Sequence, residues 1–456
     1  MSDSTSRKAA PPVLTTREGV TRTLNKGLVE TLTAFEPNWL RERRQHAWEI
    51  YEKTPMPTTK LEEWRYTDLS KKLGLEALEW AVKTECRDDF DACPQGLKDT
   101  MRDAHAAAGP IRGTDAQMIH VDLDEELAGK GVILSSLRTA IEKHPELLEK
   151  HLATEALPPE QGKFESLNAA LWTDGVFFYV PEGVSLDLPV RVTRWVSQSG
   201  VAFFSRILIV AEPGSRVSFV DEILSEDLDG QTLVSDAVEV LAQDGAQVQY
   251  VSLQRLGRGA FYQASQRTLA QRDSTLDTLN VSMGASTSRV DLNARLLGPG
   301  SNSDMLGLYF GDNDQHFDHN TSQDHVAPNT SSDLLYKGAL DQQSRSVFRG
   351  VIRVLKGAQK TDAYQTNRNL LLSEAARAVS LPNLEIEADD VRCSHGATVG
   401  QLDAESRFYL MSRGLSREQA ERLVVLGFLG EVLSRLPLGG VVEKVTNVIE
   451  EKLRQL

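Results

Sequence analysis

A short phrase that recurs about every 30 residues constrains the fold of this chain more than any other feature. Copies of the phrase begin at Val180, Ala211, Ala242, Ala270, Leu297 and Val326. The first two steps are 31 residues long, and the later steps are 28, 27 and 29 residues. Each copy places a turn residue before an alternating strand pattern, which is typical of a structural unit that stacks on its neighbours.

The segments between these turns predict strands and not helices. Runs such as GVFFYV after Asp174 and ILIV after Arg206 are rich in β-branched and aromatic residues and are bounded by Pro-Gly or Asp-Gly turns. A β-sandwich would also contain regular strands and turns, but nothing in a sandwich requires a phrase to recur at a nearly constant spacing. We therefore predict a mainly β protein whose core is a β-solenoid, or β-helix, in which the repeats are the coils.

The segments on both sides of the repeats have helical patterns. Leu24, Leu28, Leu32 and Phe35 recur at steps of three and four residues, and residues 68–82 continue the helical pattern. A tract rich in alanine at residues 106–110 then predicts a linker.

After residue 400 the sequence becomes helical again. Ser416 and Gln419 have the spacing of a capping box, and Gly414 suits the end of the preceding helix. The last helix is predicted to present Val442, Val445, Ile449 and Leu453 on one face.

These patterns predict four regions. They are a disordered tail over residues 1–19, a helical domain over 20–112, a β-helix core over 113–399 and a helical domain over 400–456. The first part of the core, to about residue 165, is expected to be partly helical. We expect the terminal helices to cover the open strand edges of the solenoid, because uncovered edges pair with other chains.

Charge and cysteine content narrow the classes of function. The 456 residues include 50 Lys and Arg against 65 Asp and Glu, a net charge of −15. Such an acidic surface repels a nucleic-acid backbone and an anionic membrane, so we expect neither as a partner. Three cysteines in a chain of this length indicate a reducing compartment. Without a signal-peptide pattern or a membrane-spanning run, the chain is predicted to be cytoplasmic.

Two clusters of residues could carry chemistry. His316, His319 and His325 lie near Asp314, Asp318 and Asp324, and both residue types bind divalent metal ions. A spacing of three places His316 and His319 on opposite faces of a strand, so a hydrogen-bonded structural role is favoured over a metal site.

Cys393 and His395 form the second cluster. In an extended segment their side chains project to the same side, and both can hold iron. A structural cysteine beside a hydrogen-bonded histidine is the alternative. Cys86 and Cys93 match no zinc or redox spacing, so we expect them to be structural or incidental. The sequence has no phosphate-binding loop, so we expect this chain to bind no nucleotide.

Several longer stretches resemble the SufB/SufD family of iron–sulfur cluster assembly proteins. They are residues 58–68 (TTKLEEWRYTD), 166–175 (SLNAALWTDG), 346–350 (SVFRG), 358–373 (AQKTDAYQTNRNLLLS), 393–403 (CSHGATVGQLD) and 408–414 (FYLMSRG). Chains of the SufB type place a cysteine and a glutamate where this sequence has Leu410 and Gly439. The resemblance is therefore to the SufD branch.

This resemblance implies a right-handed parallel β-helix between two helical domains. It implies a non-catalytic scaffold subunit that pairs with a SufB paralogue and with the ABC-type ATPase SufC. A nascent iron–sulfur cluster would form transiently at the interface with SufB, with His395 as this chain's contribution and Cys393 as a weaker candidate. The C-terminal helices, residues 416–433 and 441–456, would dock SufC.

Two other functions are consistent with a β-helix. One is an enzyme that acts on saccharides, for which Asp312, Asp314, Asp318 and Arg349 are candidate groups, although large polysaccharides are mostly met outside the cell. The other is a homodimeric SufD that binds iron at His316, His319 and Asp324.

Overall fold

The structure is a computed structural model that describes residues 22–82, 109–114, 117–436, 438 and 440–454. The tail predicted over residues 1–19, Cys86, Cys93 and Gly439 lie outside the described residues. So does most of the linker predicted at residues 106–110.

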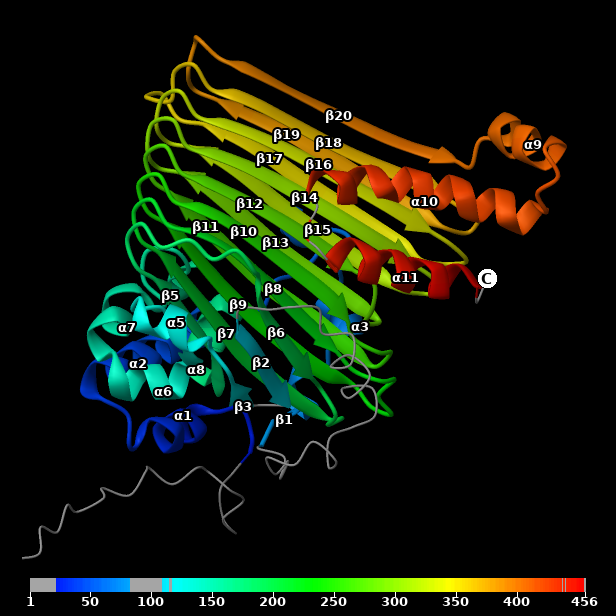
Figure 1. Ribbon diagram of the computed structural model, residues 1–456. Coiled ribbons are helices and arrows are strands. Elements are labelled where there is room, and N and C mark those ends of the chain that lie inside the picture. The colour runs from blue at the N-terminus through cyan, green and yellow to red at the C-terminus, as the bar shows by residue number, and fades with distance from the viewer. Residues whose placement is uncertain (1–21, 83–108, 115–116, 437, 439, 455–456) are drawn as a thin grey trace, which may run out of the picture.

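The core is a parallel β-solenoid built from two stacked sheets, as the repeat predicts (Figure 1). In the described part of the chain each sheet has ten strands, and from β5 onward successive strands alternate between the sheets. Sheet A contains β1 (Glu79–Trp80), β4 (Ile133–Ser136), β5 (Asp174–Val180), β7 (Val201–Ala211), β9 (Thr232–Ala242), β11 (Ala260–Ala270), β13 (Thr287–Leu296), β15 (His316–His325), β17 (Arg345–Val354) and β19 (Arg377–Ile386). Sheet B contains β2 (Gly109–Thr114), β3 (Gln117–Val121), β6 (Val190–Trp195), β8 (Arg216–Leu224), β10 (Gln247–Arg255), β12 (Thr275–Ser282), β14 (Asn302–Gly311), β16 (Ser331–Leu340), β18 (Asp362–Leu371) and β20 (Arg392–Gln401).

The recurring phrase forms the corner at which each coil passes from sheet A to sheet B. Gly214, Gly245 and Asp273 occupy equivalent corner positions with φ of 67°, 70° and 54°, the left-handed region that favours glycine. The corners also bond to one another: the Gly214 N–H donates to the Asp244 carbonyl at 2.9 Å, and the Gly245 N–H donates to the Arg272 carbonyl at 2.8 Å. The hydrogen-bond ladder of the sheets therefore continues around the turn.

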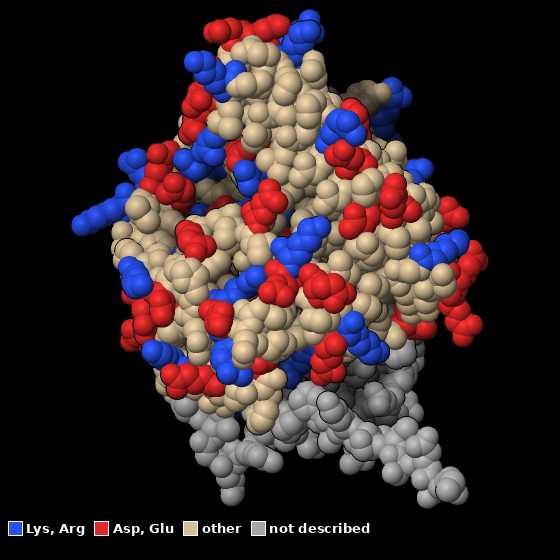
Figure 2. Space-filling model, turned by 90° about the vertical axis from the view of Figure 1, so that its left-hand side faces the viewer, with Lys and Arg blue, Asp and Glu red and all other residues tan. Residues whose placement is uncertain are grey.

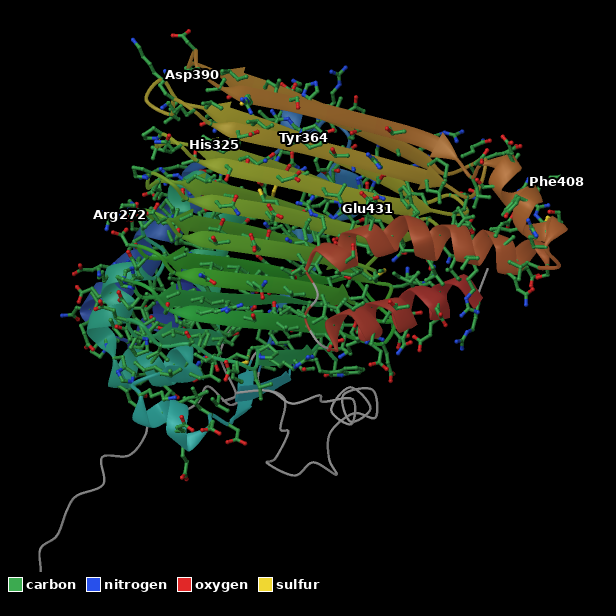
Figure 3. All side chains as sticks on the ribbon, turned by 45° about the horizontal axis from the view of Figure 1, so that its top comes forward. Arg272, His325, Tyr364, Asp390, Phe408 and Glu431 are labelled. Atoms are coloured by element: carbon green, nitrogen blue, oxygen red, sulfur yellow. The ribbon has the colours of Figure 1, made fainter. Side chains whose placement is uncertain are left out.

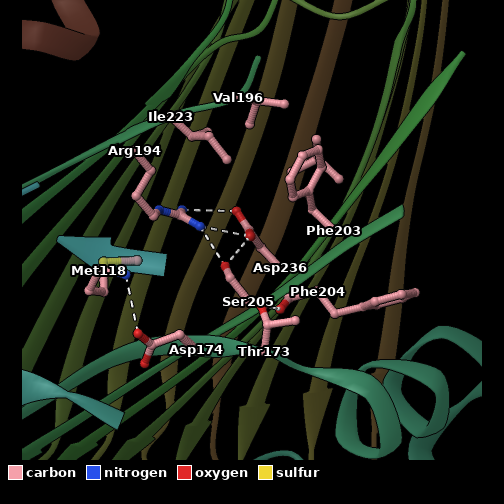
Figure 4. Close-up of a pocket in the computed structure, with 11 residues that line it drawn as sticks. Met118, Thr173, Asp174, Arg194, Val196, Phe203, Phe204, Ser205, Ile223 and Asp236 are labelled. Atoms are coloured by element: carbon pink, nitrogen blue, oxygen red, sulfur yellow. Dashed lines mark hydrogen bonds and ion pairs between the residues drawn. The ribbon is translucent and has the colours of Figure 1, made fainter. Parts of the chain in front are cut away.

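Side chains inside the solenoid stack from one coil to the next. Phe178, Phe219 and Tyr250 form a column with centroid separations of 5.7 and 6.0 Å. A buried polar cluster interrupts the apolar interior, where Arg194 bonds to Asp221 and Asp236. Figure 4 shows its bonds to Asp236. The cavity beside it has a volume of about 20 Å³, enough for a single water molecule.

The N-terminal helices pack on the outer face of sheet A. The helical elements before the core strands are α1 (Lys26–Thr33), α2 (Asn38–Lys53), η1 (Glu62–Trp64), α3 (Leu69–Lys72), η2 (Leu75–Ala77), α5 (Glu125–Gly129), α6 (Leu137–Lys143), α7 (Pro145–His151), η4 (Pro159–Gln161) and α8 (Lys163–Leu171). Their apolar side chains share one cluster with outward residues of β7, including Phe204 and Leu208.

Residues 68–82 do not form the helical stretch that their leucine pattern predicts. They divide into α3, η2 and β1, separated at Gly74. Leu69, Leu75 and Leu78 are nevertheless buried, so the pattern marked the buried face and not the type of element. Burial against the solenoid here overrides helical propensity.

The C-terminal helices are α9 (Ala404–Ser412), α10 (Arg417–Arg435) and α11 (Val441–Arg454). The capping box of Ser416 and Gln419 is confirmed, and Gly414 has a φ of 95° at the end of α9. On α11 the structure buries Val445 and Ile449 as predicted, with Val442 and Leu453 partly buried beside them.

The expectation that terminal helices cover the open strand edges is wrong at the C-terminal end. Helices α10 and α11 lie along the outer face of sheet B, where their apolar residues join outward residues of the sheet (Figure 1). The sheet needs this cover because its outward residues Leu279, Leu306 and Leu335 are apolar. Strands β19 and β20 remain at the end of the stack, and most of their residues are exposed or half-buried. Among the described helices, none is both long and apolar enough to cross a bilayer.

Candidate functional site

The open end of the solenoid is formed by β19 and β20, and β20 carries Cys393 and His395. In the register with β18, Cys393 lies beside Ala363 and His395 lies beside Gln365. Ala363 and Gln365 are buried inside the solenoid, so Cys393 and His395 lie on the inward face of the last coil. The structure thus places both side chains on one face, as their spacing predicts.

The two side chains differ in environment. His395 is exposed, whereas Cys393 is half-buried against an apolar cluster that includes Ala363, Ile352 and Val391. Burial raises the pKa of the Cys393 thiol, and the nearby Asp362 carboxylate raises it further. The thiol is therefore protonated at neutral pH, and a cation beside it would be needed to favour the thiolate.

Gln365 is a residue of this site that the sequence analysis missed. It is fully buried, and neither its side-chain oxygen nor its side-chain nitrogen has a hydrogen-bond partner among the described residues. Gly350 of β17 leaves the room for it, because a Cβ there would lie within 2.5 Å of the Gln365 amide. An amide with unmet hydrogen-bonding capacity beneath His395 is available to a ligand or to a bound water.

Ser380 of β19 is a second missed residue at this end of the stack. It pairs in register with the inward Phe348, and its buried hydroxyl oxygen also lacks a described partner. The sequence contained only part of the signal for Gln365, namely that it follows Ala363 by two residues in the stretch 358–373. The inward face could be recognised only once the register was known.

Apolar side chains surround this polar group on the terminal strands. Leu384 and Ile386 of β19 are 37% and 40% exposed, and Val399 of β20 is 44% exposed. Tyr364 of β18, also 44% exposed, lies on the outer face near the same end (Figure 3). An exposed strand edge with apolar residues is a surface to which another chain can add a strand.

The three histidines of β15 are not brought together. His316 is on the outer face, where its Nε2 lies 2.8 Å from the Thr67 hydroxyl, and His319 is inside the solenoid, stacked 4.8 Å from Tyr309. His325 bonds to the hydroxyls of Thr330 and Ser332 at 2.7 and 2.8 Å. Burial lowers the pKa of each of the three to about 4. In the described residues no group of three or more His, Cys, Asp or Glu side chains is arranged to hold a metal ion.

The acidic groups considered for saccharide chemistry occupy separate structural positions. Asp318 accepts hydrogen bonds from Thr67 and Arg289 on the outer face of sheet A. Asp312, at a corner between the sheets, accepts from Lys452 of α11 at 3.1 Å and from Arg258 at 3.2 Å.

A second exposed apolar surface lies on α9. Phe408, Tyr409 and Met411 are 72%, 57% and 43% exposed, and Phe408 projects from α9 beyond the ends of the strands (Figure 3). Leu410, where chains of the SufB type are expected to have a cysteine, is half-buried in the same helix. A group of large apolar side chains that is exposed to solvent is typical of a docking surface.

Comparisons with known proteins match nearly the whole described chain. The family model for the SUF system FeS cluster assembly, SufBD core domain matches residues 194–428, and the SufBD protein N-terminal region matches residues 116–192. An iron–sulfur cluster assembly protein SufD of Bacillus subtilis (strain 168) is 31% identical over 423 residues, which cover 92% of this chain and 95% of that protein. SufBD family proteins of Staphylococcus haemolyticus and Staphylococcus aureus are 27% identical over 436 residues, covering 92% of this chain and 91% of each relative.

Proposed function

The chain belongs to the SufBD family of iron–sulfur cluster assembly proteins, and from this premise we propose that it is a non-catalytic scaffold subunit. In this proposal it pairs with a SufB paralogue through the open end of its β-helix. It also docks the ABC-type ATPase SufC through its C-terminal helices. The cluster is cargo that is built at the interface with SufB and then released.

The observation that supports the proposal is the uncovered end of the solenoid. The N-terminal helices cover sheet A at β5–β11, and α10 and α11 cover sheet B at β8–β18, whereas β20 remains at the end of its sheet with His395 exposed. Exposed edges normally add another strand, and natural proteins rarely leave them open. A second β-helix placed against this edge would extend the sheets and cover Leu384, Ile386 and Val399.

The groups at this end fit cluster chemistry that is shared between chains. Imidazole and thiolate both bind iron, but cluster irons are usually held by four protein side chains. Cys393 and His395 supply two at most, so the proposal requires ligands from the partner. Because this thiol is protonated at neutral pH, His395 is the stronger candidate and Cys393 the weaker one.

The proposed ATPase surface is α9 with the adjoining end of α10. Phe408 of α9 and Leu423 of α10 are 72% and 51% exposed. Docking of an ATPase at α9 and α10 would connect it to sheet B, because α10 is bonded to that sheet through Lys337 and Glu431. ATP-driven movement of the ATPase could then act on the β-helix as a rigid body.

Co-expression of the tagged chain with a SufB-type paralogue and a SufC-type ATPase tests the two surfaces separately. Val399→Arg places a charge on the open edge and should remove the paralogue from the purified complex while the ATPase remains. Phe408→Asp should remove the ATPase while the paralogue remains. Each variant is the control for the other, and recovery of the wild-type chain alone would contradict the proposal.

A homodimer is the second candidate, because the same open edge could pair with a second copy of this chain. The iron site considered for it, at His316, His319 and Asp324, is not assembled in the described residues. Light scattering of the purified chain distinguishes the two. A dimer that Val399→Arg dissociates, and that persists in the presence of the paralogue, would favour the homodimer.

A further inference from the structure

A groove of about 350 Å³ lies on the outer face of sheet A and takes no part in the proposed assembly site. Its walls include Arg267 of β11, Asn293 and Arg295 of β13, Asn320 of β15, and Arg349 and Arg353 of β17. Glu63 of the N-terminal segment and Gln161 of η4 border it. Grooves of this volume are the size of small-molecule sites.

Two of the four arginines are each hydrogen-bonded to the protein. Arg267 donates to the Gln161 side chain at 2.7 Å and to the Asp291 carbonyl at 2.9 Å. Arg353 donates to Glu385 at 2.8 Å and to Asp324 at 3.3 Å. These two side chains form walls of the groove, and their bonds to the protein hold them in place.

The other two arginines have donors to spare. Arg295 is half-buried and has neither a hydrogen bond nor an ion pair with any described residue. The Nε of Arg349 is buried without a hydrogen bond, and its nearest carboxylate oxygen belongs to Glu62, which is 3.6 Å away and 65% exposed. A buried N–H such as that of Arg349 Nε is costly without an acceptor, which a ligand or a water can supply.

Asn320 adds an acceptor that also lacks a partner. The residue is 5% exposed, and its Nδ2 donates to Asp318 at 3.2 Å, which fixes the orientation of the amide. Its Oδ1 then has no donor among the described residues. In the register, Asn320 lies directly beside Arg349, so an acceptor and a donor are adjacent in the groove.

The carboxylates of the groove do not cancel this capacity. Asp324 already accepts from Asn293, Ser322 and Arg353. Asp291 is 3.4 Å from Arg289 and 3.8 Å from Arg267. The capacity for an anion therefore depends on Arg295, which no described carboxylate engages, and on the buried Nε of Arg349. It does not depend on a surplus of positive charge, because Glu62 and Glu385 also pair with arginines of the groove.

We propose that this groove binds a small hydroxylated oxyanion with at least two negative charges, such as a hydroxy-polycarboxylate or a polyol phosphate. Arg295 and Arg349 lie on strands separated by β15, so the two guanidinium groups would bind different oxygen atoms of the ligand. A hydroxyl of the ligand donates to Asn320 Oδ1. A hydroxy-polycarboxylate and a polyol phosphate both carry hydroxyl groups and negatively charged oxygens, so the proposal includes both kinds of ligand.

Isothermal titration calorimetry on the full chain in metal-free buffer tests the proposal, with citrate and glycerol 3-phosphate as the two probes. At least one should bind saturably at constant ionic strength. Arg295→Gln and Arg349→Gln should each weaken binding by about tenfold or more, the loss expected for one charge-assisted hydrogen bond. Arg417→Gln, at the exposed start of α10 on the other sheet, is the matched control and should leave binding unchanged.

The hydroxyl is tested with tricarballylate, which is citrate without its hydroxyl group. If citrate is the ligand, tricarballylate should bind more weakly, and equal binding would overturn the role of Asn320. Thermal melts of each variant establish that it is folded. Absence of saturable binding by both probes, or binding that neither arginine variant weakens, would overturn the site.

Discussion

At the scale of single residues, the proposed assembly site depends most on His395. His395→Ala should reduce the yield of cluster in a reconstituted complex with the SufB-type and SufC-type partners, because an exposed imidazole on the open edge is lost. Removing even outer-shell groups costs roughly tenfold in metal affinity, so the loss of a ligand should cost at least that. Iron and sulfide analysis measures the yield, and His46→Ala, an exposed histidine on α2, is the control. An unchanged yield would remove His395 from the site and leave the scaffold role standing.

Gln365 offers a separate test, because its effects on stability and on function should have opposite signs. Gln365→Leu keeps the volume and removes two buried polar atoms without partners. The free energy of unfolding should therefore stay level or rise by about 1–2 kcal/mol, whereas the cluster yield should fall if the amide serves the site. Urea unfolding measures the first effect and reconstitution the second. A large loss of stability would instead mean that the amide has a structural partner.

The sequence predicted the strand faces on which the candidate residues lie, but it did not predict their surroundings. A period of two placed His316 and His319 on opposite faces and Cys393 and His395 on one face, and the structure agrees with both. It could not identify Gln365 or the groove at Arg295 and Arg349. Those sites depend on register across strands about 30 residues apart, which alternation within one strand does not contain.

At the scale of elements, replacing a corner glycine should lower the stability of the protein where the φ of that glycine is positive. Gly214 has a φ of 67° and has open space around its Cα, so the cost of Gly214→Ala is conformational and not steric. We expect a loss of about 1 kcal/mol, measured by urea unfolding. Gly357 also has open space but no positive φ, and Gly357→Ala should cause no such loss. Equal effects of the two variants would contradict the conformational explanation.

Elements were predicted well where the signal is local and poorly where packing decides. The capping box at Ser416 and the turn phrase are local, and both are confirmed. Residues 68–82 have a helical pattern of leucines but form three short elements, α3, η2 and β1, that pack against the solenoid. Helices α10 and α11 were recognised, but their position on the face of sheet B was not, because an amphipathic pattern does not specify which surface it covers.

At the scale of the whole molecule, the helices divide the surface of the solenoid between them. The N-terminal group covers sheet A at β5–β11, α10 and α11 cover sheet B at β8–β18, and the last coil stays open. On the face seen in Figure 2, acidic and basic side chains are interspersed over the described surface. Recognition by this molecule is therefore expected to depend on local features, namely the open edge, the apolar residues of α9 and the arginine groove.

Buried histidines should make the stability of the whole molecule fall in mild acid. Burial lowers the pKa of His151, His316, His319 and His325 to about 4, from 6.5 in the unfolded chain. Below pH 6.5 the unfolded chain binds protons that the folded chain does not. The stability present above pH 6.5 is therefore lost as the pH falls toward 4, by up to about 3 kcal/mol per histidine.

Urea unfolding at pH 7.5 and pH 5 measures this dependence. His316→Gln removes one of the four groups while keeping a polar side chain opposite Thr67, so its stability should fall less between the two pH values than that of the wild type. His46→Gln replaces an exposed histidine, and its loss of stability should match the wild type. If His316→Gln and His46→Gln behaved alike, the proton uptake would have to come from other groups. His316, which lies beside Thr67 on the outer face of sheet A, would then not contribute to the loss of stability in acid.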